Sequence, residues 1–515
     1  MRAVVGYEEK DPVICAQIHS GYPRFVTHPF VRELGAQISR ERAFEGRTLC
    51  LTSSRRMAEE AAAHLQDPGA QAFTRGDIHG VAFPREAGTE RRARTFLQHV
   101  GGILSSRHAE DTLVARGVTA RAADEALFQG DPAAEIRRVL RRAYAANGVR
   151  PQSRGVQAGL GSDPNPRKRV RSRFSGSQTE SGSDPLLLSD RDIVLAPSGM
   201  NAVYAAFRAV SALQAARGRT VWVQLGWLYL DTIAILKTLT PDAARDYVCV
   251  PDVTGLAALE ALFAAHGTRI AAIVTEVPTN PLMQTADVAA VSALARRHGA
   301  MVLLDPTMAS PFNVDVLGHA DVVVNSLTKF AAPDGDVIAG AVVINPAGPD
   351  ADALRSGIME HVEPVYARDV ARLAAEIDGY EDLVARINAT TPQVAAFLES
   401  HPAVRDVFWS QRQETRANYQ ALARTAASVG AVVSFTLEGP IERFYDRVGI
   451  PKGPSFGMAN SLLCPYLYLA HYDLVRTEAG RAELAAHGLD ASLIRLSIGL
   501  EPPDTIIAAL AEALR

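Results

Sequence analysis

From about residue 190 onward, short apolar runs alternate with segments of helical periodicity, and this alternation constrains the fold more than any other feature. The apolar runs lie at 193–195, 221–223, 270–274, 301–304, 322–324 and 341–344. The helical segments lie at 201–215, 230–239 and 288–297. Runs that are apolar at nearly every position are typical of strands buried on both faces. We therefore predict an α/β fold in which helices cover both faces of a parallel sheet.

The chain changes character along its length, and 515 residues exceed what one compact core usually accommodates. We predict five segments: an N-terminal extension of unassigned role (1–100), a helical segment (101–148), a linker (149–189), a large α/β domain (190–366) and a small C-terminal α/β domain (367–515). The extension is expected to pack against the large domain.

The predicted linker is rich in Gly, Ser, Pro and Arg and nearly free of large apolar residues, a composition typical of disorder. It contains the basic cluster RKRVRSR at 167–173. Such a cluster is either part of a solvated loop or a contact for nucleic acid or an acidic partner. We expect the solvated loop, because no aromatic side chain lies within the cluster and the whole chain has a formal net charge of −4. No nucleic-acid partner is therefore predicted.

Several other classes of protein are disfavoured by the sequence. No run of about 18 apolar residues occurs, so no membrane-spanning helix is expected. The N-terminus carries charges where a secretory signal needs an apolar stretch, which favours a cytoplasmic location. The four cysteines are scattered and form no CxxC pair, so neither a metal site nor a disulfide framework is predicted.

Lys329 is the one lysine, of five in the chain, that directly follows a buried strand. The segment 321–329 reads DVVVNSLTK. Enzymes that form a Schiff base need one lysine held at a site with a tuned amine. A lysine after a strand is more often a solvated strand end, so this interpretation needs support from other residues.

Asp305 gives that support, because it ends the buried strand MVLLD at 301–305. A desolvated carboxylate is costly unless it meets a cation. The protonated pyridine nitrogen of pyridoxal phosphate (PLP) is such a cation, and an aspartate beside it keeps the ring an electron sink. The alternatives are a helix cap and a metal ligand, and no cluster of His or carboxylate residues nearby favours the metal.

The stretch LAPSGMNA at 195–202 predicts a strand, a tight turn and the start of a helix. Gly199 permits a close approach of the backbone, and the first N–H groups of a helix attract anions. Ser198, Ser326 and Thr328 can add hydroxyl donors. With the lysine and the aspartate downstream, this turn is a candidate anchor for a phosphate.

Spaced motifs in the second half of the chain carry a resemblance to a known family. They read EVPTNPL at 276–282, LDPT at 304–307, NSLTK at 325–329, GDVIAG at 335–340 and RLSIGLE at 495–501. In this order they resemble the Cys/Met-metabolism PLP-dependent enzymes, the cystathionine γ-synthase-like family of fold-type I. The resemblance implies a mostly parallel sheet of seven strands with helices on both faces, and a smaller C-terminal α/β domain.

The resemblance also implies roles for residues at the cofactor. Lys329 forms the internal aldimine with PLP and later moves protons, while Asp305 pairs with the pyridine nitrogen. Tyr229 stacks on the ring. Lys329, Asp305 and Tyr229 are the expected catalytic residues. Asn280 contacts the phenolic oxygen of the ring. The remaining cofactor contacts are expected from Ser198, Gly199, Met200, Thr307, Ser326 and Thr328.

For the substrate, the resemblance implies that Arg495 clamps the α-carboxylate, a bidentate task suited to a guanidinium. Ser455 and Asn280 are expected beside that carboxylate. In the family a Tyr-x-Arg motif reaches the cofactor phosphate of a neighbouring subunit, and its nearest counterpart here is SSR at 105–107. Arg107 is therefore the candidate for that contact, and we expect the helical segment to lie at the interface of a homodimer or homotetramer.

The sequence departs from the commoner members of the family. The motif Tyr-Gly-Gly-Thr reads YLDT at 229–232, and the Gly-Gly-His-Ser after the lysine reads APDG at 332–335. With the segments 21–25 and 464–466, these departures are similar to a longer branch of the family that is best represented in fungi. The missing tyrosine of Tyr-x-Arg leaves open whether the reaction is γ-replacement or elimination.

We predict a γ-replacement of the trans-sulfuration type, in which a thiol such as cysteine replaces the leaving group of an O-acyl-homoserine. A γ-lyase, an O-acylhomoserine sulfhydrylase or a γ-synthase that uses another nucleophile is the alternative at the same site. A non-catalytic scaffold with the basic linker as a binding segment is the alternative of a different class. The presence of Lys329, Asp305 and Arg495 argues against the scaffold.

Overall fold

The structure is a computed structural model that describes the chain except residues 16, 18–26, 122–124 and 146–187. The segment 21–25 and nearly all of the predicted linker, including its basic cluster, lie outside the described residues. The boundaries of the five segments stay predictions.

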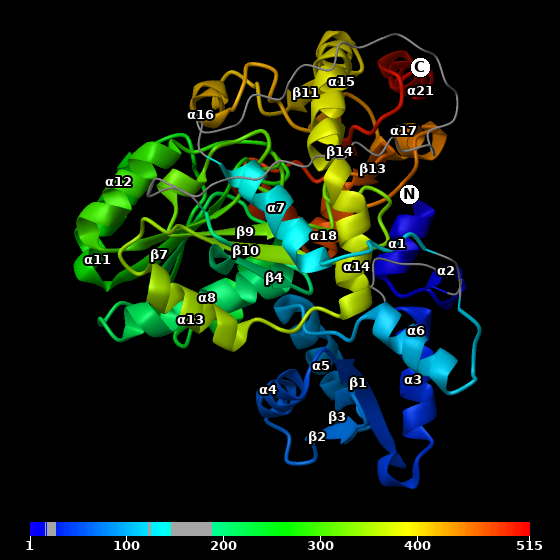
Figure 1. Cartoon of the computed structure of the whole chain (residues 1–515). Helices are drawn as coiled ribbons and strands as arrows, with labels where there is room; N and C mark the ends of the chain where they lie inside the picture. The colour runs from blue at the N-terminus through cyan, green and yellow to red at the C-terminus, as the bar shows by residue number, and fades with distance from the viewer. Residues whose placement is uncertain (16, 18–26, 122–124, 146–187) are drawn as a thin grey trace.

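A seven-stranded sheet of order β4-β10-β9-β8-β7-β5-β6 lies at the centre of the chain (Figure 1). Its strands are β4 (Ile193–Ala196), β5 (Val221–Leu225), β6 (Tyr247–Val250), β7 (Ile270–Glu276), β8 (Met301–Asp305), β9 (Val322–Ser326) and β10 (Gly340–Ile344). β10 pairs antiparallel with β4 and β9, and the other neighbours are parallel. The prediction of a mostly parallel sheet is confirmed. β6 was not predicted; it is a short edge strand with the sequence YVCV and is only partly buried.

Helices cover both faces of this sheet. They are α8 (Gly199–Ala215), α9 (Leu230–Leu239), α10 (Ala243–Asp246), α11 (Ala257–His266), α12 (Val288–His298) and α13 (Ala351–His361). Successive residues of a strand point to opposite faces. In β8, Leu303 packs in the core that holds Leu354 of α13, whereas Val302 and Leu304 pack in the core that holds Val291 of α12. Each strand is therefore apolar at nearly every position because both of its faces are buried.

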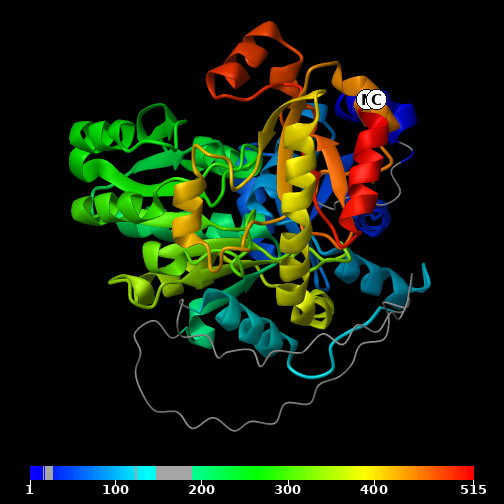
Figure 2. The same ribbon diagram turned by 90° about the horizontal axis from the view of Figure 1, so that it is seen from above.

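The C-terminal part of the chain forms an antiparallel sheet of order β11-β12-β14-β13. Its strands are β11 (Val404–Phe408), β12 (Val432–Leu437), β13 (Leu462–Pro465) and β14 (Ile494–Ser497). The helices of this part are α14 (Ala367–Glu376), α15 (Tyr380–Ser400), α16 (Arg416–Leu422), α17 (Ile441–Arg447), α18 (Tyr466–Ala470), α19 (Tyr472–Val475), α20 (Glu478–Ala486) and α21 (Pro503–Ala513). Figure 2 shows α15 and α21 side by side along this sheet. The expected smaller α/β unit is thus present.

The N-terminal extension folds into a three-stranded antiparallel sheet of order β1-β3-β2, placed below the central sheet in Figure 1. Its elements are α1 (Arg2–Glu8), α2 (Pro12–Cys15), α3 (Pro29–Ser39), β1 (Arg47–Thr52), α4 (Arg55–Leu65), β2 (Gln71–Arg75), β3 (Ile78–Pro84) and α5 (Ala87–Val100). Helix α5 contacts α8 and α9, and its Phe96 and Leu97 share one apolar core with Ala206 of α8. The extension therefore packs against the large sheet, as expected.

The segment after the extension contains α6 (Ser106–Ala115) and α7 (Pro132–Tyr144). Helix α7 buries Ile136, Val139 and Leu140 in the core of its own chain.

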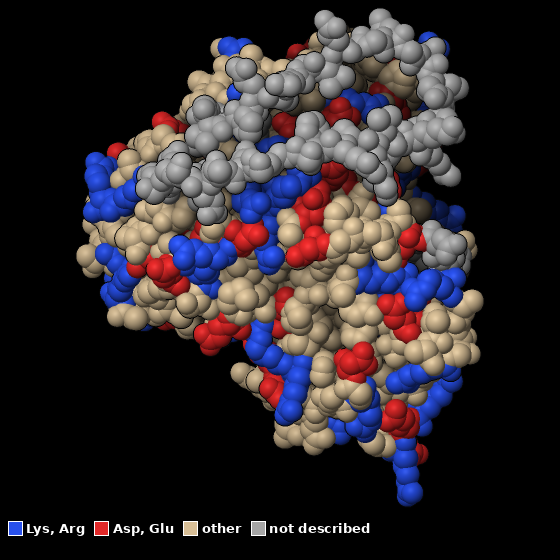
Figure 3. Space-filling view, in the orientation of Figure 1, with Lys and Arg blue, Asp and Glu red and all other residues tan. Residues whose placement is uncertain are grey.

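Over the face drawn in Figure 3, Lys and Arg side chains lie interspersed with Asp and Glu side chains. Within the described residues, no helix is long and apolar enough to cross a membrane.

Candidate active site

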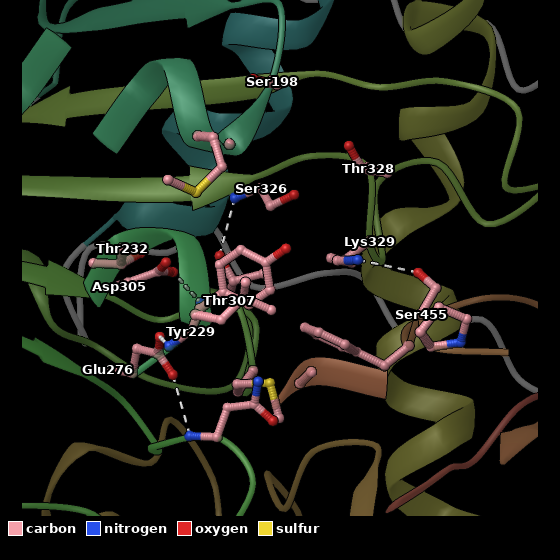
Figure 4. A pocket seen from close by; sticks show the side chains of 18 of the residues that line it. Ser198, Tyr229, Thr232, Glu276, Asp305, Thr307, Ser326, Thr328, Lys329 and Ser455 are labelled. Atoms are coloured by element: carbon pink, nitrogen blue, oxygen red, sulfur yellow. Dashed lines mark hydrogen bonds between the residues drawn. The ribbon is translucent and has the colours of Figure 1, made fainter. Parts of the chain in front are cut away.

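The carboxyl ends of five strands meet at one edge of the central sheet, and a pocket lies there (Figure 4). Ser198 follows β4, Tyr229 follows β5, and Glu276, Asp305 and Ser326 end β7, β8 and β9. Ligands of open α/β sheets bind at this edge. Twelve of the predicted site residues line the pocket: Ser198, Gly199, Met200, Tyr229, Asn280, Asp305, Thr307, Ser326, Thr328, Lys329, Ser455 and Arg495.

Lys329 enters the pocket from the loop after β9. Its Nζ donates to Oγ of Ser455 over 3.1 Å and lies 4.8 Å from the centre of the Phe456 ring. Figure 4 shows Lys329 and Ser455 on one side of the pocket and Asp305 with Glu276 on the other. The amine and the Asp305 carboxylate can therefore contact opposite ends of one bound molecule.

Asp305 ends β8, lines the pocket and is half-buried. Burial raises the pKa of Asp305 to about 6, although a hydrogen bond from the backbone N of Thr307 (2.9 Å) opposes the rise. A cation bound at this carboxylate would offset the cost of its burial.

The N-terminus of α8 forms another wall of the pocket. Ser198 caps the helix, because its Oγ accepts a hydrogen bond from the backbone N of Asn201 over 3.0 Å. A Cβ atom added to Gly199 would lie 2.8 Å from Cβ of Ser326, so a larger residue would force the turn apart. The helix start is thus packed tightly against the end of β9, with its first N–H groups available to an anion.

Two threonines connect the strand ends. Oγ1 of Thr307 accepts a hydrogen bond from the backbone N of Ser326 over 2.9 Å and so ties the end of β9 to the loop after β8. The hydroxyl of Thr328 accepts from the backbone N of Ala339 (3.1 Å) and lies 3.2 Å from its carbonyl oxygen, to which it donates. A contact from Thr328 to a phosphate would require this proton to turn away from Ala339.

Glu276 is a buried pocket residue that the sequence reasoning did not assign. Its Oε1 accepts from the backbone N of Tyr229 (2.5 Å), and its Oε2 accepts from the backbone N of Asn280 (3.1 Å). Burial, and then the charge of Asp305, raise the pKa of Glu276 well above its ordinary value. Glu276 ends β7 just as Asp305 ends β8, and this shared position was the signal that could have found it.

Arg495 projects from β14 and is 3% exposed. Its Nη1 donates to Oδ1 of Asn280 over 3.0 Å, and its Nη2 donates to the carbonyl oxygen of Pro454. The guanidinium carbon lies 4.7 Å from the centre of the Tyr466 ring and 5.4 Å from that of Phe456. These hydrogen-bond acceptors are neutral, so the buried cation suits an anionic ligand. The two aromatic residues were not predicted, because they lie in a loop and at the start of a short helix.

Arg107 is the predicted site residue that does not line this pocket. It forms ion pairs with Glu125 (2.8 Å), Asp369 (3.1 Å) and Asp336 (3.2 Å) of its own chain. It lies in a neighbouring pocket whose lining includes Ser198 as well. Its contact with the cofactor of a neighbouring subunit stays a prediction, and a phosphate would have to compete there with three carboxylates.

The pocket has the groups that PLP needs. The carboxylate of Asp305 suits the protonated ring nitrogen, the N-terminus of α8 suits the phosphate, and the amine of Lys329 can form a Schiff base with the aldehyde. The carboxylate and the amine lie on opposite sides of one cavity, so a single ring can reach both.

Comparison with known proteins gives the same assignment. The family described as "Cys/Met metabolism PLP-dependent enzyme" matches residues 187–515. An L-2-amino-4-chloropent-4-enoate dechlorinase/desaturase of Streptantibioticus cattleyicolor is 38% identical over all of this chain and 94% of its own. A cystathionine gamma-synthase of Neurospora crassa is 34% identical over 64% of this chain and 52% of its own.

A solved structure of a methionine gamma lyase from Micromonospora echinospora is 30% identical and superposes with a TM-score of 0.52. It covers 63% of this chain and 82% of its own. The family match spans more than half of the chain and includes the whole pocket. The protein therefore belongs to the Cys/Met-metabolism family of PLP-dependent enzymes.

Proposed function

We propose that this enzyme removes a leaving group from the γ-carbon of a short L-2-amino acid and releases the product by elimination. The observation that carries the proposal is the composition of the pocket wall. In the described chain, Arg495 and Lys329 are the two cations that line the pocket, and the wall beside them is formed by Phe456, Tyr466 and Leu469. One guanidinium binds the α-carboxylate, so no further lining cation of this chain is left for a second carboxylate on the substrate.

The dechlorinase/desaturase that matches the full length of this chain supports an elimination at the γ-carbon. By its name it acts on L-2-amino-4-chloropent-4-enoate, an amino acid whose chlorine is on the γ-carbon. Such a substrate has one carboxylate and a short apolar tail, which suits the wall described above. We therefore favour chloride as the leaving group. The C–Cl bond at the γ-carbon breaks and its electron pair leaves with chloride. A C–H bond on a neighbouring carbon also breaks, its proton goes to a base and its electron pair forms a new π bond, with a net loss of HCl.

Different residues of the pocket are proposed to bind the substrate, transfer protons and cover the cofactor. Bound PLP supplies an electron sink, which makes protons on the carbons next to the amino group acidic. Arg495 binds the α-carboxylate and is itself oriented by Asn280. Nζ of Lys329, held beside Ser455, takes up and returns protons at Cα. Tyr229 is proposed to cover the cofactor ring. A homodimer or homotetramer and a cytoplasmic location remain part of the proposal.

The second candidate is the predicted γ-replacement on an O-acyl-homoserine by a thiol. The identity of 34% to a cystathionine gamma-synthase favours it. An O-acyl-homoserine also has a γ-leaving group, so both candidates place the same chemistry at Cα and differ in the step after that group is lost.

The test is a substrate panel with the purified holoenzyme. L-2-Amino-4-chloropent-4-enoate and the O-acetyl, O-succinyl and O-phospho esters of homoserine are each supplied with and without cysteine. We expect chloride release that does not depend on cysteine, measured by ion chromatography, and an amino-acid product that is lighter than the substrate by HCl, detected by mass spectrometry. Lys329→Ala is the control and should abolish release. Cystathionine formation from an ester, without dechlorination, would replace the proposal with the second candidate.

A further inference from the structure

Asp231 is a carboxylate in the first turn of α9 with no exposed surface. Its Oδ2 accepts a hydrogen bond from the hydroxyl of Tyr229 over 3.2 Å. Its Oδ1 accepts from Nε2 of Gln98 over 3.1 Å and lies 3.8 Å from Nε2 of His99. An acid in the first turn of a helix interacts favourably with the helix dipole, but that interaction does not require the side chain to be buried. A buried carboxylate is tolerated when its oxygens are bonded, and both oxygens are bonded here.

Gln98 and His99 come from the C-terminal end of α5, in the N-terminal extension. The two residues after them in the chain contact the turn proposed to bind the phosphate. The carbonyl oxygen of Val100 accepts from Nδ2 of Asn201 over 3.1 Å. Gly101 has a φ of +66°, and a Cβ added to it would overlap Oγ of Ser198. Residues 98–101 therefore abut both the start of α8 and the start of α9.

Tyr229 is held at its two ends. Its backbone N donates to Glu276 over 2.5 Å, and its hydroxyl donates to Asp231 over 3.2 Å. With both ends bonded, the direction of the ring between them is set. Position 231 is where the commoner motif has a glycine, which offers no acceptor for the hydroxyl, so this contact is a property of the departure from the motif.

We propose that Asp231, which accepts a hydrogen bond from Gln98, is a positioning residue that fixes the phenol of Tyr229 in the pocket. The N-terminal extension is then part of the support of the active site, beyond its packing against the large sheet. The inference deepens the proposed function, since it rests on Tyr229 covering the cofactor ring. It concerns the orientation of Tyr229 and does not depend on which leaving group the substrate has.

The test is a double-mutant cycle on the holoenzyme. Asp231→Asn leaves one acceptor oxygen where two now accept, so kcat should fall about 10-fold or more while KM for the amino acid changes little. In a Tyr229→Phe background the same substitution should have no further effect, because the hydroxyl it orients is gone. Gln98→Leu should give a smaller loss with the same dependence on Tyr229. Thr95→Ala, exposed on the same helix, is the matched control and should change kcat by less than about 2-fold.

A second readout does not use turnover. Visible circular dichroism of the bound cofactor should change in the same way in Asp231→Asn and in Tyr229→Phe, and titration of the apo-proteins should show weaker PLP binding in both. If the losses from Asp231→Asn and Tyr229→Phe are additive, or the dichroism of Asp231→Asn equals that of the wild type, the inference is wrong. If Asp231→Asn does not fold, Gln98→Leu in both backgrounds gives the same decision. If the substrate panel shows no dechlorination, the proposed function fails, but the cofactor spectra of these variants still decide whether Asp231 orients Tyr229.

Discussion

Replacing Asp305 with asparagine should stabilise the apo-protein at neutral pH. Burial raises the pKa of Asp305 to about 6 from an ordinary 3.8, a gap that corresponds to about 3 kcal/mol. Because the pKa of the folded state is the higher one, the free energy of unfolding of the wild type falls as pH rises from about 4 to about 6, and stays low above that. Asparagine has no charge to bury, and its Oδ1 can keep the bond from the backbone N of Thr307. Asp305→Asn should therefore gain up to about 3 kcal/mol, and less where water enters through the pocket.

Asp305→Asn should stabilise the apo-protein but weaken the binding of PLP. With PLP bound, the protonated ring nitrogen compensates the carboxylate, and losing a hydrogen bond between charged groups costs about 1.5–3 kcal/mol, or about 10- to 150-fold in affinity. Asp305→Asn should therefore bind PLP about that much more weakly.

Two measurements test the expected gain in stability and the expected loss of PLP affinity. Urea unfolding of both apo-proteins is followed at about pH 7.5 and about pH 4.5, where the stability difference should shrink. PLP titration of the same apo-proteins gives the affinities. A less stable Asp305→Asn apo-protein at the higher pH, or a stability difference that does not depend on pH, would refute the argument. Unchanged PLP affinity would refute the pairing with the ring nitrogen.

Three further variants test other parts of the pocket. Arg495→Lys keeps the charge but loses the planar fork, so KM for the amino acid should rise about 10-fold or more with PLP affinity unchanged; an equal KM in steady-state assays speaks against the clamp. Gly199→Ala places a Cβ 2.8 Å from Cβ of Ser326, so titration of the apo-protein should show weaker PLP binding with unchanged far-UV circular dichroism. Glu276→Gln turns an amide NH₂ toward one of the two backbone N–H groups that the carboxylate now accepts. It should cost about 1–3 kcal/mol in urea unfolding, and a neutral result would mean that the two bonds are not both needed.

The central sheet could be predicted because both of its faces are buried. The runs at 301–304 and 322–324 are apolar throughout, and each is followed by polar residues that then line the pocket. Parallel strands bring such residues to the same edge, so neighbours in space can be inferred from strand ends alone. The motif match added roles for Asn280 and Arg495, whose place in the pocket no local pattern indicates.

The N-terminal extension could be placed only in part. Its packing against the large domain was expected, and the contacts of α5 with α8 and α9 confirm it. Its role could not be predicted, because the contacts of α5 with α8 and α9 join residues more than a hundred positions apart. Side-chain contacts between distant segments leave no periodic signal in either segment.

Position 231 shows how such a contact can still be detected in principle. An acid in the first turn of a helix has a sufficient local explanation, the helix dipole, and that explanation hides the buried role of Asp231. The departure from the Tyr-Gly-Gly-Thr motif is the informative observation, because a carboxylate that replaces glycine beside a buried site must find donors. Polar residues on otherwise apolar helix faces are the places to look for them, and Gln98, within FLQHV at the end of α5, is such a residue.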